Sequence, residues 1–296
     1  MREVIYVGKN QKYQTINQAI NSISNPAYIV LTDKIYYEKV IIDKPNIIID
    51  GQNKARIIYD DYATKIHADG REYNTFRTYT VLIKASHVIL KNLTIENSAG
   101  EGYEVGQAVA LHCYNDYITC INVSLIAHQD TLFCGPLSPD LITRYVDLLP
   151  ENERVYRGEF HQMFINCYIC GTVDFIFGGA SADFINCTIE SLPSRKNTWI
   201  CAPNHVKTNT YGFNFYECKF ISSMIEPIVF LARPWREYGM ANFYHCYLGK
   251  HINEKGFDKW NDTDRHLTAR FYEENSYGEG ANSENRASWA LKKDNK

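Results

Sequence analysis

A short alternation of polar and apolar residues recurs along most of the chain. In each copy a polar residue, usually Asn, precedes an apolar residue or Cys, and a second apolar residue follows two places later. The six copies are LKNLTIEN (90–97), CINVSLIA (120–127), FINCYICG (164–171), FINCTIES (184–191), FYECKFIS (215–222) and FYHCYLGK (243–250). A period of two residues predicts strands rather than helices.

The spacing of these copies predicts how the strands are arranged. Equivalent positions lie 20 to 44 residues apart, and these positions are Leu93, Val123, Cys167, Cys187, Cys218 and Cys246. Periods of this size are typical of solenoids. No helix-length amphipathic segment separates the copies, which argues against alternating strands and helices. We predict an all-β fold, a single-stranded parallel β-helix that forms one domain over residues 1–296. The alternative is a β-sandwich with coincidental spacing.

The same pattern predicts what the repeated side chains do. Four cysteines share one register and should stack in the interior as small buried hydrophobic residues. The asparagines before the repeated positions should lie where the strands bend, because Asn tolerates left-handed backbone. These asparagines are Asn92, Asn122, Asn166 and Asn186.

Three segments depart from the repeat. Residues 14–24 place Ile16, Ala19, Ile20 and Ile23 on one apolar stripe, which predicts a short helix that plugs the open end of the solenoid. Thr15 should be the N-cap of this helix. Residues 134–160 are rich in Pro and charged residues and are predicted to be a long loop. The polar tail from residue 274 should pack loosely along the outside.

Charge and cysteine content limit the partners and the compartment. The net charge of −3 gives no basic footprint for nucleic acid and no polybasic membrane patch, so a polyanionic partner must meet local positive residues. No signal peptide or run of 18 apolar residues is seen. The nine cysteines, an odd number, fit a reducing compartment. We expect a cytoplasmic monomer without metal or other cofactor; the alternative is a secreted protein whose signal has been removed.

Four polar islands lie within otherwise apolar stretches and are the candidates for chemistry. They are GQAVALHCYND (106–116), AHQDTLF (127–133), GTVDFIFGGASADF (171–184) and FLARPWREYG (230–239). Equivalent positions on successive coils lie side by side, so Gln107, Asp130 and Asp174 should converge on one outer face. Two neighbouring carboxyl groups separate in pKa, which yields one acid and one base or nucleophile. Arg233 could hold one of them ionised, and amides can donate hydrogen bonds to an oxyanion.

These islands resemble the signature motifs of the pectin methylesterases, which are carbohydrate esterases. The matching stretches are QAVAL (107–111), QDTL (129–132), GTVDFIFG (171–178) and ARPW (232–235), and weaker matches are YQTINQAI (13–20), LTIENSAG (93–100), GFDKW (256–260) and YGEGANSENRASW (277–289). The resemblance therefore covers nearly the whole chain. It implies a right-handed parallel β-helix and the hydrolysis of galacturonate methyl esters in pectin or pectic oligosaccharides, with release of methanol.

The resemblance also implies a role for each matching residue. Asp174 resembles the nucleophile and Asp130 the general acid and base, while Gln129 and Gln107 resemble the oxyanion donors. Arg233 resembles the partner that keeps Asp174 charged. The substrate-binding positions implied by the family are Trp235 and Phe177, as walls of the sugar cleft, and Thr80 in RTYTVLI. The missing N-terminal inhibitory region suggests a short bacterial type that acts on imported oligogalacturonides.

The chain departs from the family pattern at three positions, and two other functions remain open. Ala232 replaces a Gly, Phe133 stands where Tyr is frequent, and Cys201 stands where Thr is common. The alternatives to the esterase are another pectin-active β-helix enzyme, namely a lyase or a polygalacturonase, and a non-catalytic carbohydrate-binding solenoid.

Overall fold

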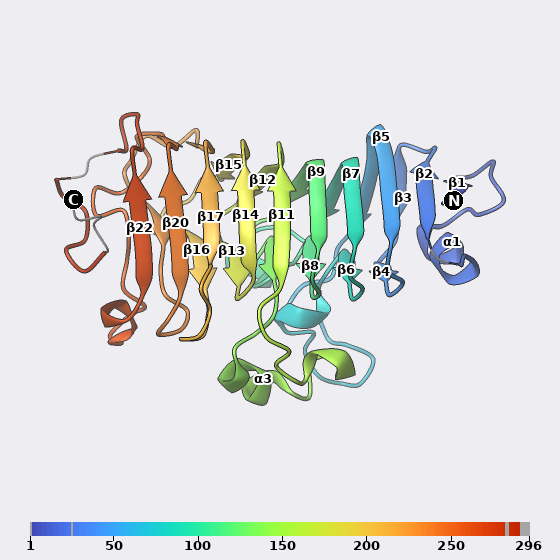
Figure 1. Ribbon diagram of the computed structural model, residues 1–296, viewed down its shortest axis with the longest axis horizontal. Helices are drawn as coiled ribbons and strands as arrows, with labels where there is room; N and C mark the ends of the chain where they lie inside the picture. Colours follow the sequence, from blue (N-terminus) through green and yellow to red (C-terminus); the bar gives the residue numbers. More distant parts are fainter. Residues whose placement is uncertain (1, 25, 282–283, 291–296) are drawn as a thin grey trace.

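The chain forms a parallel β-helix in the computed structural model, which describes residues 2–24, 26–281 and 284–290. Strands stack coil upon coil along one axis, and the two termini lie at opposite ends of the solenoid (Figure 1). Every pairing between the named strands is parallel, and the solenoid is all-β, as predicted. The alternative of a β-sandwich is wrong.

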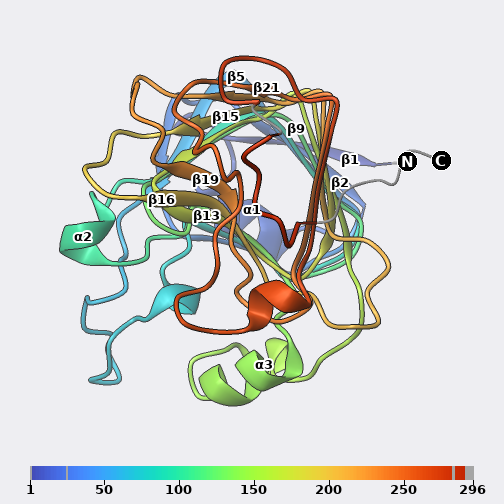
Figure 2. The same cartoon turned by 90° about the vertical axis from the view of Figure 1, so that its left-hand side faces the viewer.

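Three strand faces surround the core, as the view along the axis shows (Figure 2). The first face is β4 (Val40–Ile42), β6 (Val81–Ile83), β8 (Leu111–Cys113), β10 (Leu132–Cys134), β13 (Val173–Gly178), β16 (Thr198–Pro203) and β19 (Val229–Ala232). The second is β1 (Glu3–Val7), β2 (Ala27–Leu31), β5 (Ile47–Tyr59), β7 (Val88–Asn97), β9 (Ile118–Ile126), β11 (His161–Ile165), β14 (Ser181–Ile185), β17 (Phe213–Tyr216), β20 (Met240–Tyr244) and β22 (Arg270–Glu274). The third is β3 (Ile35–Tyr37), β12 (Tyr168–Gly171), β15 (Thr188–Ser191), β18 (Lys219–Ile221) and β21 (Tyr247–Leu248).

The motif that recurs in the sequence forms the bend between the second and third faces. Asn92, Asn122, Asn166 and Asn186 have φ between 52° and 56°, and Glu217 and His245 adopt the same left-handed backbone in the later coils. The residue that follows each bend points inward, and the four repeat cysteines are at most 2% exposed. Both predictions for these positions are confirmed.

Aromatic residues continue this stacking through the interior. Phe164, Phe184, Phe215 and Phe243 stack in sequence, with ring centroids 4.8, 4.5 and 4.9 Å apart and nearly parallel planes. Stacked aromatic pairs contribute about 0.5–1.5 kcal/mol each beyond their burial. The core therefore fixes the register of neighbouring coils, which in turn places the side chains of the outer faces.

Both ends of the solenoid are covered. Helix α1 (Ile16–Ser22) lies at the N-terminal end (Figure 1), and Thr15 and Gln18 form a capping box at its start, as Thr15 was predicted to do. At the other end Trp289 packs 5.8 Å from Phe271, and Arg286 binds Glu273 at 2.7 and 3.2 Å. The prediction of a loosely packed tail is wrong for residues 284–290, because an aromatic ring and a buried ion pair hold them.

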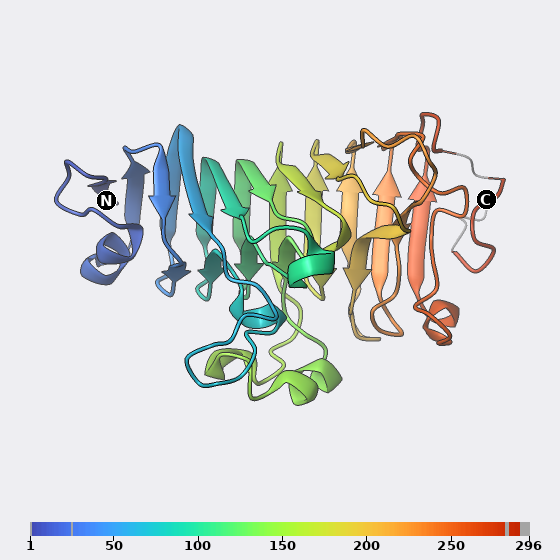
Figure 3. The same cartoon turned by 180° about the vertical axis from the view of Figure 1, so that it is seen from behind.

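Two long segments leave the coils, project from one side of the solenoid as excursions and lie side by side (Figures 1 and 3). The first runs from residue 60 to 80 and contains the 3-10 helix η1 (Thr75–Arg77). The second contains α3 (Pro139–Tyr145) and η2 (Glu151–Glu153), so residues 134–160 are not the plain loop that was predicted. Its apolar anchors Leu141 and Ile142 are buried. The remaining helices are α2 (Gly102–Val105) and η3 (Arg265–Leu267).

Candidate active site

Asp130 and Asp174 lie next to each other on the first face. Asp130 comes two residues before β10, Asp174 lies in β13, and the amide of Asp130 donates to the carbonyl of Val173 at 3.1 Å. Both aspartates have a left-handed backbone, with φ of 63° and 49°. Such φ values are uncommon outside Gly, Asn and Asp. The bend turns each carboxyl group out of the coil, where each residue keeps 8% of its surface exposed.

Arg233 binds only one of the two carboxyl groups. Its Nε and Nη2 donate to the two oxygens of Asp174 at 2.8 and 2.6 Å, which is a bidentate pair. No side chain among the described residues donates a hydrogen bond to the Asp130 carboxyl group. The two aspartates are therefore chemically different although they are neighbours.

The electrostatics follow from this difference. Burial raises the pKa of Asp130 well above its usual range, and the neighbouring Asp174 raises it further. Burial also raises the pKa of Asp174, but Arg233 opposes this through its charge and its hydrogen bonds. Of the two carboxyl groups, Asp130 therefore has the stronger tendency to keep its proton, whereas the anion of Asp174 is compensated by Arg233.

Two indole rings hold Arg233 in place. The guanidinium carbon lies 3.6 Å from the centroid of Trp199 and 4.2 Å from that of Trp260. Trp199 Nε1 donates to Asp258 at 2.8 Å. Sequence reasoning assigned no role to these three residues. The two tryptophans and the aspartate are visible in the stretches TWICAP and GFDKW, but these stretches lie far from Arg233 in the sequence, so the contact could not be inferred from it.

The two glutamines lie on adjacent coils beside the aspartates. The amide of Ala108 donates to the carbonyl of Gln129 at 3.1 Å, which sets Gln107 beside Gln129. Their side-chain amides have no hydrogen-bond partner in the described part of the chain, so both are free to donate to a ligand. Gly102 of α2 covers Gln129 closely, because a Cβ at this glycine would lie 2.7 Å from Gln129 Oε1.

The predicted substrate-binding residues occupy three different environments. Trp235 is half-buried at the surface, with its ring centroid 6.0 Å from that of Phe177. Phe177 itself is only 2% exposed and supports Trp235 from below. Thr80 is fully buried and donates its hydroxyl to the carbonyl of Glu96 at 2.9 Å. The structure therefore does not present Thr80 to the surface that carries the aspartates.

The three departures from the family pattern are all accommodated in the core. Ala232, Phe133 and Cys201 are fully buried. Ala232 has no left-handed φ, so the side chain that replaces Gly causes no backbone strain before Arg233. The Phe133 ring packs 5.0 Å from Phe177, where a hydroxyl would have little contact with water.

A family model described as pectinesterase matches residues 4–136 and 145–296. The chain belongs to the pectinesterase family. Among curated relatives, Pectinesterase QRT1 of Arabidopsis thaliana is 30% identical over 304 residues, which cover 98% of this chain and 73% of the relative.

Solved pectin methylesterase structures share the fold of this pectinesterase-family chain. The Aspergillus niger enzyme has a TM-score of 0.79 at 23% identity and covers 98% of this chain and 89% of its own. A pectin methylesterase in complex with a hexasaccharide has a TM-score of 0.78 at 24% identity, covering 99% and 94%. The right-handed parallel β-helix predicted from the resemblance is confirmed.

No group of three or more His, Cys, Asp or Glu among the described residues is placed to hold a metal ion. In the same residues, no helix has the length and apolar character needed to cross a bilayer.

Proposed function

We propose that this protein hydrolyses the methyl esters of galacturonate units in pectin or pectic oligosaccharides. The observation that carries the proposal is the pair of buried aspartates, which differ in their partners. Only Asp174 accepts the bidentate hydrogen bonds of the Arg233 guanidinium group. Membership of the pectinesterase family supports the substrate class. The hexasaccharide complex of a pectin methylesterase with the same fold supports an oligosaccharide as the substrate.

The proposed reaction begins with attack by Asp174 on the C6 carbonyl carbon of the ester. The carbonyl oxygen gains negative charge, and the amides of Gln107 and Gln129 donate hydrogen bonds to it. Asp130, which holds a proton because it is buried beside a second carboxyl group, transfers that proton to the departing methoxy oxygen. Methanol leaves, and an anhydride between the substrate and Asp174 remains.

Water completes the cycle. Asp130, now a carboxylate, removes a proton from a water molecule that attacks the carbonyl of the galacturonate unit. The bond to Asp174 breaks, and the product is a galacturonate carboxyl group. Asp174 returns as an anion bound to Arg233, and Asp130 is protonated again. No group outside the chain and the two substrates is needed to balance the reaction.

One set of assays tests this function against its alternatives. Methylated pectin is incubated with the protein, and methanol, new reducing ends and the absorbance of unsaturated products are measured. The esterase gives methanol alone, a galacturonase gives reducing ends, a lyase gives unsaturated products, and a carbohydrate-binding solenoid gives none of the three. Asp174→Asn should abolish methanol release with an unchanged circular dichroism spectrum. Turnover retained by this variant would remove Asp174 as the nucleophile.

The compartment is a separate part of the proposal. All nine cysteines are buried and none forms a disulfide, which supports a compartment where thiols stay reduced. Fractionation of the source cells, with detection by antibody, should place the protein with cytoplasmic markers. Recovery from the medium would overturn this assignment and leave the proposed reaction intact.

A further inference from the structure

Two guanidinium groups converge on one backbone carbonyl close to the aspartate pair. Arg236 Nη1 and Arg265 Nη1 donate to the carbonyl of Trp235 at 2.6 and 2.8 Å. Trp235 is the half-buried indole that packs near Phe177. It lies beyond β19, which ends at Ala232. The two arginines therefore hold a stretch of backbone that lies outside the strand pairing.

A carboxylate compensates this cluster of positive charge. Two guanidinium groups at one acceptor repel each other, and Arg236 Nε donates to the carboxylate of Asp140. Partial burial raises the pKa of Asp140, but hydrogen bonds from Ser138 and Arg236 lower it by more, to below its usual value. Burial and the nearby Arg236 lower the pKa of Arg265, while Glu237 and Asp140 oppose this. Asp140 is thus an anion at neutral pH that stabilises the arginine pair.

Asp140 belongs to the second excursion and not to a coil of the solenoid. It lies in the first turn of α3, where the hydroxyl of Ser138 donates to its other carboxylate oxygen at 2.6 Å. Leu141 and Ile142 of the same helix are buried and anchor it. The contact with Arg236 joins residues that are 96 positions apart in the sequence. The second excursion thereby reaches the segment that carries Trp235.

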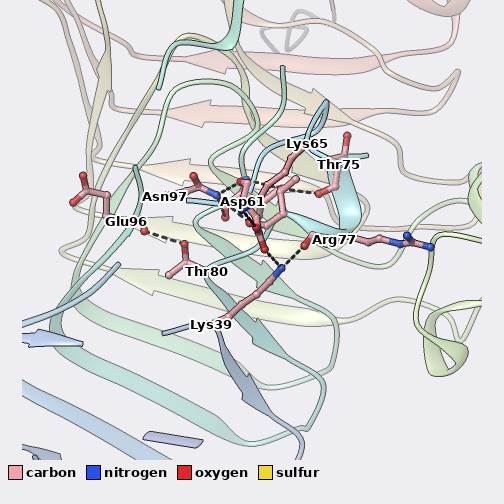
Figure 4. A network of polar contacts seen from close by, with 10 residues as sticks. Lys39, Asp61, Lys65, Thr75, Arg77, Thr80, Glu96 and Asn97 are labelled. Carbon is pink, nitrogen blue, oxygen red and sulfur yellow. Dashed lines mark hydrogen bonds and ion pairs between the residues drawn. The ribbon is translucent and has the colours of Figure 1, made fainter. Parts of the chain in front are cut away.

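The first excursion is held by a separate network (Figure 4). The Lys39 ammonium binds the buried Asp61 carboxylate and the carbonyl of Arg77. In the turn of the same excursion, Arg71 binds Asp69 at 3.1 Å, and both side chains are partly exposed. None of these contacts involves the segment that follows β19. The first excursion therefore offers a matched control for changes made in the second.

We propose that Asp140 is a positioning residue for substrate binding, which acts through Arg236 to fix the backbone of Trp235 and with it the indole that forms a wall of the sugar cleft. The proposal rests on the proposed function for the identity of the sugar and for the role of Trp235. Asp140 acts on the binding of the sugar ring and not on the breaking of the ester bond. The second excursion thus contributes to affinity for the polymer without contacting it.

A kinetic test separates binding from chemistry. Asp140→Asn removes the charge and keeps the size of the side chain. The KM for a methylated oligogalacturonide should rise about two- to fivefold, as expected for loss of a partly exposed ion pair, while kcat changes by less than about twofold. Asp140→Glu keeps the carboxylate and should restore most of the lost affinity.

A double variant tests the route through Arg236. Arg236→Met removes the hydrogen bonds to Trp235 and Asp140 and should raise KM at least as much as Asp140→Asn does. Adding Asp140→Asn to Arg236→Met should cause no further rise, because the two residues act as one unit. Fully additive effects of the two changes would overturn the route through Arg236.

A spectroscopic readout follows the indole itself. The chain has four tryptophans, so fluorine NMR of protein labelled with 5-fluorotryptophan is simple enough for Trp235→Phe to assign the signal of Trp235. This signal should shift or broaden in Asp140→Asn. Arg71→Gln breaks the partly exposed ion pair in the first excursion and is the matched control, which should change neither the Trp235 signal nor KM.

The outcomes separate this positioning role from the proposed function. An unchanged KM in Asp140→Asn would overturn the role, and so would an unchanged Trp235 signal or a fall in kcat as large as the rise in KM. Absence of methanol release by the unmodified protein would overturn the proposed esterase. The Trp235 signal, and the Kd for the methylated oligogalacturonide in place of KM, would then decide the role of Asp140.

Discussion

The guanidinium carbon of Arg233 lies 3.6 Å from the ring centroid of Trp199, so the group that binds Asp174 is itself held by an indole. Cation–π contacts contribute about 0.5–2 kcal/mol, with the larger values at desolvated sites. Trp199 in turn is tied to Asp258. The orientation of the proposed nucleophile therefore depends on residues from three coils.

Replacing the indole should weaken catalysis without removing any reacting group. Trp199→Leu leaves the Arg233 fork free to move, and we expect kcat to fall about tenfold, which corresponds to about 1.4 kcal/mol. Asp258→Asn retains the ring and should cost less than threefold. Initial rates of methanol release measure both variants. A rate within twofold of the unmodified protein in Trp199→Leu would show that the stack does not position Arg233.

The acid side of the pH–rate profile should depend on Arg233. Asp174 must be ionised to attack, and Arg233 opposes the rise in its pKa that burial causes. Arg233→Gln removes this opposition, so the acid limb of kcat/KM should move to higher pH and the maximum rate should fall. Arg233→Lys should give a smaller displacement, because a point charge does not reproduce the planar fork. An unmoved acid limb in Arg233→Gln would mean that another group sets it.

Stability should change with pH through Asp130. Its pKa is raised in the folded protein, so above about pH 4, the usual unfolded value, the native state binds more protons than the unfolded chain. The free energy of unfolding therefore falls as pH rises towards the folded pKa. Asp130→Asn removes this loss and should melt at a higher temperature than the unmodified protein at neutral pH, with the difference vanishing near pH 4. Thermal scans from pH 3.5 to 8 measure it, and a neutral-pH Tm below that of the unmodified protein would contradict the assignment.

Gln129 should contribute to the rate through its amide. Gln129→Leu removes an oxyanion donor, and we expect kcat to fall about a hundredfold, or roughly 3 kcal/mol. Gly102→Ala offers an independent test, because its Cβ would push against Gln129 Oε1 and should lower kcat with little change in Tm. A loss below threefold in Gln129→Leu would limit this residue to packing or substrate positioning.

The solenoid and its repeated bends could be predicted from local chemistry. Asn92 and its equivalents indicate a left-handed backbone, and the apolar residues that follow them are buried. The number of residues between successive copies is enough for one coil of the solenoid. The helix after Thr15 could be predicted for the same reason, since its cap and apolar stripe lie within a few residues of one another. The motifs around Asp130 and Asp174 also identified the family.

Only the tertiary structure decided which residues meet. Trp199 and Trp260 pack on Arg233 from distant parts of the chain, and Asp258 in turn binds Trp199. The tail closes the solenoid through Trp289 and Arg286. Arg154 comes to lie near Tyr79 because the excursion that contains helix α3 folds back beside it. The backbone preference of a residue and the alternation of polar and apolar side chains depend on residues that are close in the sequence. Both can therefore be recognised from the sequence alone. Contacts between outward-facing side chains of different coils depend on the number of residues in the turns of each coil. The side chains that meet are therefore determined only when the coils stack.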